Sequence, residues 1–224
     1  YVLGLTATPY RKDGHQPIIH MQCGPIVYEI KQKDIASAIG EKKVIVKNTG
    51  FTFENSEKAA IQDIMKALVT NEARSAMLIN DIAEAASQGR FPMVLTERKE
   101  HLAYLEKQLA GKVKIIVLLS GGMGKKKIKA SMDMLNASQS GDSRVIIATG
   151  SYVGEGFDLP GLDTIFLTTP LSYKGRLIQY AGRIQREYEG KEEIRIYDYL
   201  DLNVPVLKKM YEKRLKTYKI MGYT

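Results

Sequence analysis

Hydrophobic positions along this chain follow two patterns that alternate from one end to the other. Short runs of apolar and β-branched residues predict strands, and between them apolar positions recur every three or four residues, which is the period of an amphipathic helix. The strand pattern occurs at residues 43–48, 92–97, 114–120, 144–150, 163–169 and 194–200. The helical pattern occurs at residues 56–69, 71–88, 98–110, 124–139, 174–186 and 203–220.

Most of the strand runs are continuously apolar, as in "RVIIATG" (144–150), rather than strictly alternating. A continuous apolar run indicates that both faces of a strand are covered, and strands that alternate with helices indicate a parallel sheet. The sequence therefore predicts an α/β fold, a doubly wound and mostly parallel sheet with helices on both faces. Ligands of such sheets bind beyond the carboxyl ends of the strands.

A segment rich in proline, glycine and charge, residues 9–25, has no sustained period. Such a composition is typical of a connection between domains. We therefore expect a boundary near Gly24, with residues 1–24 holding the last strand of a first domain plus a linker, and residues 25–224 forming a second domain. Because the chain begins at Tyr1 inside an apolar, strand-like run, we expect it to be a fragment.

The chain is basic, since 33 lysines and arginines against 25 acidic residues give a net charge of +8. This balance suits a polyanionic partner such as nucleic acid, although solubility alone would also explain it. Cys23 is the only cysteine, which excludes an intrachain disulfide and favours a reducing, cytoplasmic compartment. His15, His20 and His101 show no metal-ligand spacing, and no apolar run approaches the ~20 residues of a membrane span.

The loop after the fourth predicted strand, "ATGSYVGEGFDLPGLD", contains four glycines and two hydroxyl residues at its start, Thr149 and Ser151. Glycine at this density lets backbone N–H groups approach a phosphate or a sugar closely. Asp158 is suited to accept a hydrogen bond from a ribose hydroxyl or to pair with an arginine. The alternative is an ordinary strand-to-helix turn in which Asp158 caps a helix.

Two other strand ends also carry polar residues. "LLSGGMGKKKIKA" fails the pattern of a Walker phosphate loop twice, because Leu119 stands where glycine is needed and Lys126 where a hydroxyl is needed. Ser120 with the following lysines is suited to a backbone phosphate, but it equally fits a solvated charge run. In "LTERKEH", Thr96 and Arg98 are suited to a phosphate, and Thr96 is equally suited to cap the helix of residues 98–110.

The stretch "QYAGRIQRE" (179–187) places Gln179, Gly182, Arg183 and Arg186 at i, i+3, i+4 and i+7, on one polar face of the predicted helix. A solvated outer face is the simplest interpretation of such a stripe. The chain has no Walker loop, and no Asp-Glu pair follows a strand to hold Mg²⁺. If a nucleotide is bound, another domain must therefore supply most of its site.

Taken together, these motifs resemble the second RecA-like domain of superfamily 2 helicases, and the opening residues look most like the XPB/Rad25 type of that superfamily. "TAT" (6–8) is similar to motif III, "VLTERKEH" to motif IV, and "LLSGGM" to the strand-end motif that follows it. "ATGSYVGEGFDLPGLD" is similar to motif V and "QYAGRIQR" to motif VI. The motifs span residues 3–186 in the order of the family.

The resemblance implies a site for ATP with Mg²⁺ between two RecA-like lobes, with the Mg²⁺ ligands on an N-terminal lobe that this chain lacks. Arg183 and Arg186 would reach the γ-phosphate as arginine fingers, with Arg186 the stronger candidate. Gln179 would help read the nucleotide, and Gly156 and Asp158 would approach its ribose. Residues implied to hold the nucleic-acid backbone are Thr96, Arg98, Ser120, Thr149 and Gly150. Thr6 and Thr8 would couple the two sites.

We therefore expect the C-terminal lobe of an ATP-dependent DNA helicase or translocase, inactive in ATP hydrolysis without its N-terminal lobe. DNA is favoured over RNA as the partner, and its binding should be salt-sensitive and weakly sequence-selective. Two alternatives remain, the motor part of a restriction system and a module that binds or anneals nucleic acid without unwinding it. The basic helix of residues 203–220 lies beyond the family's motifs, and we expect it to pack on the sheet rather than to bind DNA or a partner.

Overall fold

The computed structural model describes residues 3–4, 16–28, 40–139, 141–153 and 159–224. Thr6, Thr8, Gly156 and Asp158 lie outside the described residues. The strands are β1 (Glu41–Asn48), β2 (Pro92–Thr96), β3 (Ile115–Leu119), β4 (Arg144–Thr149), β5 (Thr164–Leu167) and β6 (Glu193–Leu200). The helices are α1 (Gln16–Cys23), α2 (Ile61–Thr70), α3 (Glu72–Ser87), α4 (Lys99–Leu109), α5 (Lys125–Asn136), α6 (Gly150–Val153), α7 (Lys174–Ile184) and α8 (Pro205–Ile220).

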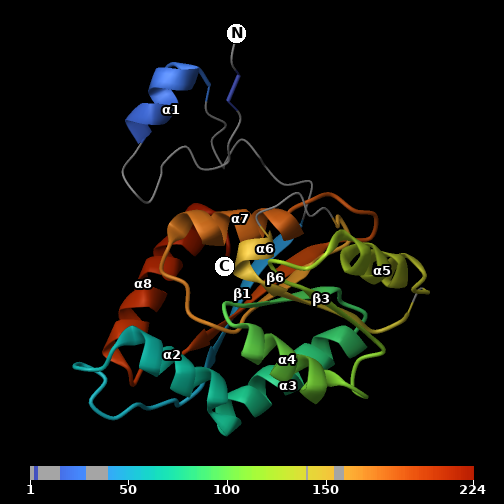
Figure 1. Ribbon diagram of the computed structural model, residues 1–224, viewed down its shortest axis with the longest axis horizontal. Coiled ribbons are helices and arrows are strands. Elements are labelled where there is room, and N and C mark those ends of the chain that lie inside the picture. Colours follow the sequence, from blue (N-terminus) through green and yellow to red (C-terminus); the bar gives the residue numbers. More distant parts are fainter. Residues whose placement is uncertain (1–2, 5–15, 29–39, 140, 154–158) are drawn as a thin grey trace.

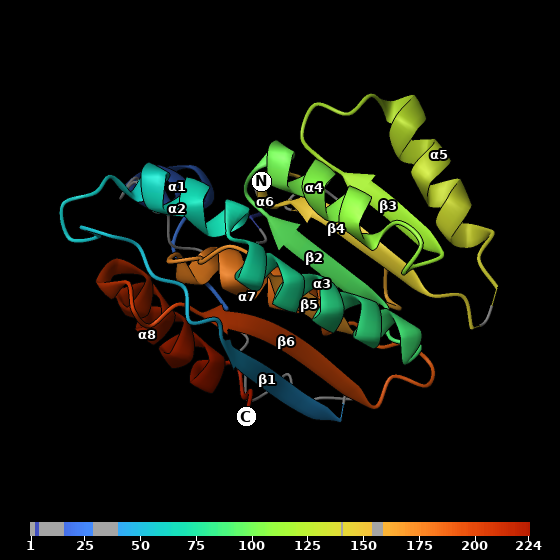
Figure 2. The same ribbon diagram turned by 90° about the horizontal axis from the view of Figure 1, so that it is seen from below.

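The six described strands form one sheet in the order β1-β6-β5-β2-β4-β3, and every pairing between them is parallel. Figures 1 and 2 show this sheet between two layers of helices, with α3 and α4 on one face and α7 on the other. The doubly wound α/β fold predicted from the sequence is confirmed. The carboxyl ends of all strands consequently lie along one edge of the sheet.

Strand β4 explains why the strand runs are continuously apolar. Val145 and Ile147 belong to the core cluster that includes α3 and α4, whereas Ile146 and Ala148 belong to the cluster that includes α7. All four side chains are essentially inaccessible to solvent. Because alternate residues of a strand point to opposite faces, a strand covered on both sides needs an apolar residue at every position.

Helix α8 packs as expected from its amphipathic pattern, with Leu207 and Tyr218 buried on its inner side. Arg214 is also buried, and its guanidinium donates two hydrogen bonds to the Asp198 carboxylate of β6, at 2.7 and 2.8 Å. The hydroxyl of Tyr218 donates to the same carboxylate at 2.7 Å. This buried pair seats α8 beside the sheet, and the lysines of the helix remain on its outer side.

The first two helices differ from the sequence prediction. Residues 16–23 form α1 inside the segment expected to be irregular, and Gly24, with a φ of 78°, ends this helix by donating its N–H to the carbonyl of His20. Helix α2 begins at Ile61 rather than at residue 56. Asn55 has a φ of 51°, and its carbonyl accepts from the N–H groups of Lys58 and Ala59. Ala60, which follows this turn, has an extended backbone with a ψ of 139°, so the helix begins only at the next residue.

None of the helices in the described part of the chain combines the length and the apolar character needed to cross a membrane.

Candidate functional site

The loops after β3 and β4 meet at the carboxyl edge of the sheet. The N–H of Gly121 donates to the hydroxyl of Thr149 across a distance of 3.3 Å, which joins the Ser-Gly-Gly loop to the end of β4. Ser120 and Gly150 flank this contact in the chain, and both are half-buried. The fold therefore brings together three of the residues that sequence reasoning predicted to hold a nucleic-acid backbone.

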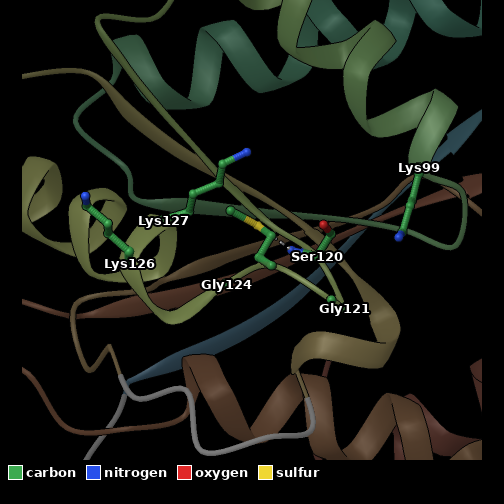
Figure 3. Close-up of a pocket in the computed structure, with 8 residues that line it drawn as sticks. Lys99, Ser120, Gly121, Gly124, Lys126 and Lys127 are labelled. Carbon is green, nitrogen blue, oxygen red and sulfur yellow. Dashed lines mark hydrogen bonds between the residues drawn. The ribbon is translucent and has the colours of Figure 1, made fainter.

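A pocket of about 440 Å³ opens beside this junction. Figure 3 shows that its lysines come from two elements, Lys99 from α4 and Lys126 and Lys127 from α5, around the loop that starts at Ser120. The remaining lining residues are one serine, three glycines and one methionine: Ser120, Gly121, Gly122, Met123 and Gly124. Gly122 has a φ of 85°, a conformation that side chains other than glycine rarely adopt.

The electrostatics of this pocket favour an anion. Helix α5 begins beside it with no acidic residue in its first turn, and Gly124, its N-cap, provides no side chain to bond the first N–H groups. Those N–H groups carry the positive end of the helix dipole, and lysine side chains add to the same field. The pocket can therefore accept a phosphate group through backbone N–H groups and ammonium groups.

Thr96 lies at the end of β2, but its side chain is buried, with 1% of its surface exposed. Its hydroxyl lies 2.9 Å from Nδ1 of His101 and accepts from the N–H of Arg98 at 3.3 Å. The guanidinium of Arg98 donates to the carbonyl of Gln62 at 3.1 Å. The hydroxyl of Thr96 thus bonds the residue before α4 and a histidine within it, and the side chain of Arg98 contacts the first turn of α2.

Helix α7 presents the predicted polar face only in part. Its inner side is buried as expected, Gln179 and Gly182 are exposed, and Arg183 is half-buried. The helix ends at Ile184, so Arg186 follows a break and does not continue the helical face. The prediction of one helix over residues 174–186 was therefore wrong at its end. Lys191 accounts for the difference, because its ammonium binds the carbonyls of Ile184 and Arg186.

A contact between β2, α6 and α7 was missed by sequence reasoning. Arg176 of α7 pairs with Glu97, next to Thr96, at 3.2 Å. Tyr180, one turn further along α7, is buried, and burial together with the negative charge of Glu97 raises its pKa to about 12. A side chain at Gly150 would collide with the Tyr180 hydroxyl and the Glu97 carboxylate. A Cβ atom at residue 150 would therefore fit only if the side chains of Tyr180 and Glu97 moved.

Two buried arginines hold the segment that leads from β5 into α7. Arg74 of α3 is fully buried, pairs with Asp201 at 3.1 Å, and donates to the carbonyl of Thr168 at 2.8 Å. Arg214 of α8 donates to the carbonyl of Leu171 at 2.9 Å. Sequence periodicity gives no signal for either contact, since both arginines lie on helices whose exposed faces also carry charged residues.

The comparison with known families gives a direct match. Residues 73–187, just over half of the chain, match the helicase conserved C-terminal domain. This range begins in α3 and ends just after Arg186, so it includes the pocket, the end of β4 and the whole of α7.

Among curated proteins, the chain is 26% identical over 233 aligned residues to a protein of Acanthamoeba polyphaga mimivirus named "Putative ATP-dependent RNA helicase L396". The alignment covers 100% of this chain and 42% of the viral protein. The chain therefore spans less than half the length of this relative.

Among solved structures, the crystal structure of T4 UvsW has a TM-score of 0.66 at 15% identity, over 85% of this chain and 42% of that chain. Dbp5 of S. cerevisiae, bound to RNA and ADP BeF3, has a TM-score of 0.64 at 14% identity, over 98% of this chain and 49% of that chain. Both likenesses concern the fold and agree with the predicted RecA-like sheet. With the family match over the motif-bearing residues, the protein belongs to the helicase conserved C-terminal domain family, which confirms the superfamily 2 helicase C-terminal domain predicted from the sequence.

Proposed function

We propose that this chain is the C-terminal lobe of an ATP-dependent superfamily 2 helicase or translocase. The observation that carries the proposal is the anion pocket at the ends of β3 and β4, in the same domain as α7, which carries Arg183 of motif VI and is followed by Arg186. The pocket suits a nucleic-acid backbone, and the arginines of motif VI suit a nucleotide. A motor that moves along nucleic acid needs both.

The nucleotide in this proposal is ATP with Mg²⁺, bound between this lobe and an N-terminal one. Arg183 and Arg186 would stabilise negative charge on the γ-phosphate, and Gln179 is exposed on the same helix as Arg183. Permanent cations beside an exposed amide are a donor set that fits a triphosphate. In the same proposal, the N-terminal lobe supplies the Mg²⁺ ligands, and Gly156 and Asp158 approach the ribose of the nucleotide.

The N-terminal segment supports a second lobe. Met21, Val27 and Tyr28 are more than 80% exposed, although large apolar side chains normally lie in a core or an interface. A first RecA-like lobe joined through residues 1–24 would cover such a surface, and Thr6 and Thr8 would then couple the two lobes. Helix α1 ends at Cys23, and the domain boundary near Gly24 is part of this proposal.

The nucleic acid in this proposal is held through Ser120, Thr149 and Gly150 and the pocket lysines, with Arg98 at one side. DNA is the first candidate, because the opening residues resemble the XPB/Rad25 type. RNA is the second candidate, because the mimivirus relative is named as an RNA helicase and the Dbp5 structure contains RNA. A restriction motor and an annealing module remain the alternatives, and the measurement below separates the annealing module from a motor.

The test uses the full-length protein that contains this chain, with ATP turnover measured in the presence of single-stranded DNA and RNA of one sequence. For Arg186→Ala we expect turnover to fall by about 10³-fold or more, the scale of an arginine finger. Binding of the nucleic acid should be nearly unchanged, because Arg186 follows α7 and does not line the pocket.

Lys219→Ala is the control, because this exposed cation lies near the end of a different helix, α8. Near-normal turnover of Arg186→Ala would remove the finger assignment. A full-length protein that binds nucleic acid without any ATP turnover would instead favour the annealing module.

A further inference from the structure

Lys191 joins two loops that are distant in sequence. Its Nζ donates to the carbonyl of Pro160 at 2.6 Å, to that of Ile184 at 3.1 Å and to that of Arg186 at 2.7 Å. Pro160 belongs to the loop that leads into β5, and the other two carbonyls belong to the end of α7 and the residues that follow it. An ammonium group has three donors, and all three are used here.

These contacts explain where α7 ends. The last carbonyls of a helix have no partner within the helix and carry the negative end of its dipole, so a cation beside them is favourable. The ammonium of Lys191 takes this place, and the chain bends at Arg186 to bring a further carbonyl to it. The backbone of Arg186 is consequently bonded to the side chain that also holds the loop before β5.

Holding Lys191 in this place removes part of the water around its ammonium group, which is unfavourable. Lys191 is half-buried, and burial lowers its pKa to about 8, although the negative charge of Asp163 acts in the opposite direction. Carbonyl dipoles compensate a buried ammonium less completely than a carboxylate at hydrogen-bond distance does. A lysine held in this way indicates that the position of the bonded backbone matters.

We propose that Lys191 is a positioning residue that fixes the backbone of Arg186 against the loop before β5. This role rests on the proposed function, in which Arg186 reaches the γ-phosphate of ATP. Lys191 does not contact the nucleotide. It sets the point from which the arginine side chain extends, and a displacement of about 1 Å in a catalytic group can cost about 10²-fold in rate.

The first part of the test needs no ATP turnover. Lys191→Met keeps the length of the side chain and removes its three donors, and the control Lys174→Met removes an exposed lysine from the other end of α7. We expect amide hydrogen exchange in residues 159–162 and 184–188 to rise by at least about tenfold in Lys191→Met and to stay unchanged in Lys174→Met. Unchanged exchange in both variants would overturn the proposal.

The second part measures ATP turnover in the full-length protein. For Lys191→Met we expect kcat to fall by about 10²-fold, with KM for ATP and nucleic-acid affinity changed much less. In the double variant with Arg186→Ala there should be little loss beyond that of Arg186→Ala alone, since Lys191 acts through Arg186. Lys191→Arg, which keeps a cation and its donors, should recover part of the rate and would show that the loss does not come from misfolding.

The two proposals fail in different ways. If Arg186→Ala turns over ATP normally, the finger assignment fails and the role of Lys191 in catalysis fails with it. If Arg186→Ala is inactive and Lys191→Met is not, or if their effects multiply in the double variant, the Lys191 proposal alone is overturned.

Discussion

His101 is a buried histidine whose ring hydrogen-bonds inside the protein. Its Nδ1 pairs with the hydroxyl of Thr96, and 2% of its surface is exposed. Burial, and to a lesser extent the nearby charge of Arg74, lowers the pKa of His101 to about 4. At neutral pH the ring is therefore uncharged and can complete the bond that places the start of α4. The hydroxyl of Thr96, at the end of β2, has the His101 ring as a hydrogen-bond partner.

The low pKa of His101 predicts how the free energy of unfolding changes with pH. In the unfolded chain His101 takes up a proton near pH 6.5, whereas in the folded chain it does so only near pH 4. Between these values the unfolded state binds more protons, so the free energy of unfolding falls as pH falls through this window. We expect His101 to contribute a decrease of about 2 kcal/mol between pH 7 and pH 5.

Chemical unfolding of wild type and His101→Gln at both pH values measures this contribution. The glutamine side chain keeps a polar partner for Thr96 but does not titrate. All other groups act equally in the two proteins, so the difference between their pH slopes isolates His101. Equal slopes would show that His101 takes up its proton at the same pH in the folded and the unfolded chain.

At the scale of elements, α7 is fixed at both ends by contacts from outside the helix. Arg74 and Arg214 hold the carbonyls of the segment before it, and Lys191 holds those at its end. Between these points its inner face packs against the sheet and against Gly150 at the start of α6. The helix that carries the start of motif VI therefore has little freedom to shift.

Two glycines test this packing in opposite directions. At Gly150 a Cβ atom would collide with the buried hydroxyl of Tyr180 and with Glu97, whereas at Gly182 it would meet nothing within 4 Å. We expect Gly150→Ala to lower the free energy of unfolding by about 1–3 kcal/mol, the usual range for overpacking. Gly182→Ala should raise it by up to about 1 kcal/mol, because alanine is the better residue inside an exposed helix turn. Denaturant unfolding curves give both values, and a stabilised Gly150→Ala would refute the close packing.

For the molecule as a whole, basic side chains are spread over more than one surface. Helix α5 lies beside β3 at one edge of the sheet and α8 lies beyond β6 near the other edge, as Figure 2 shows. Both carry adjacent exposed lysines, Lys126 and Lys127 on α5 and Lys208 and Lys209 on α8. If net charge alone drives binding, both lysine pairs should contribute equally to nucleic-acid affinity. If the pocket beside α5 is a specific phosphate site, the α5 pair should contribute more.

The two pairs therefore form a matched experiment. Changing Lys126 and Lys127 to glutamine should weaken binding of single-stranded nucleic acid, and it should reduce the slope of log affinity against log salt by about 0.7 for each phosphate group that is no longer bound. Changing Lys208 and Lys209 to glutamine removes the same charge and should leave the slope nearly unchanged. Titrations at several salt concentrations give the slopes, and equal effects would mean that the pocket is not a specific phosphate site.

The elements of this fold could be predicted well from the sequence, because hydrophobic period is a local property of the chain. All six predicted strands and all six predicted helices occur, although α2 begins five residues later than predicted. The helicase resemblance also follows from short local motifs, and the family match over residues 73–187 agrees with it. The roles of Arg183, Arg186, Gln179 and the nucleic-acid residues remain predictions, since they depend on ligands and on a second lobe.

The sequence by itself determined that this chain forms a parallel α/β domain and which loops line one edge of its sheet. Tertiary structure alone decided that α7 stops at Ile184, although the helical pattern continues through Arg186, because the ammonium of Lys191 binds the carbonyls there. It also decided that Thr96 is buried against His101, and that Gly150 meets Tyr180 and Glu97. Such contacts join residues from different segments of the chain. The local hydrophobic pattern carries no information about them, so they appear only in the folded structure.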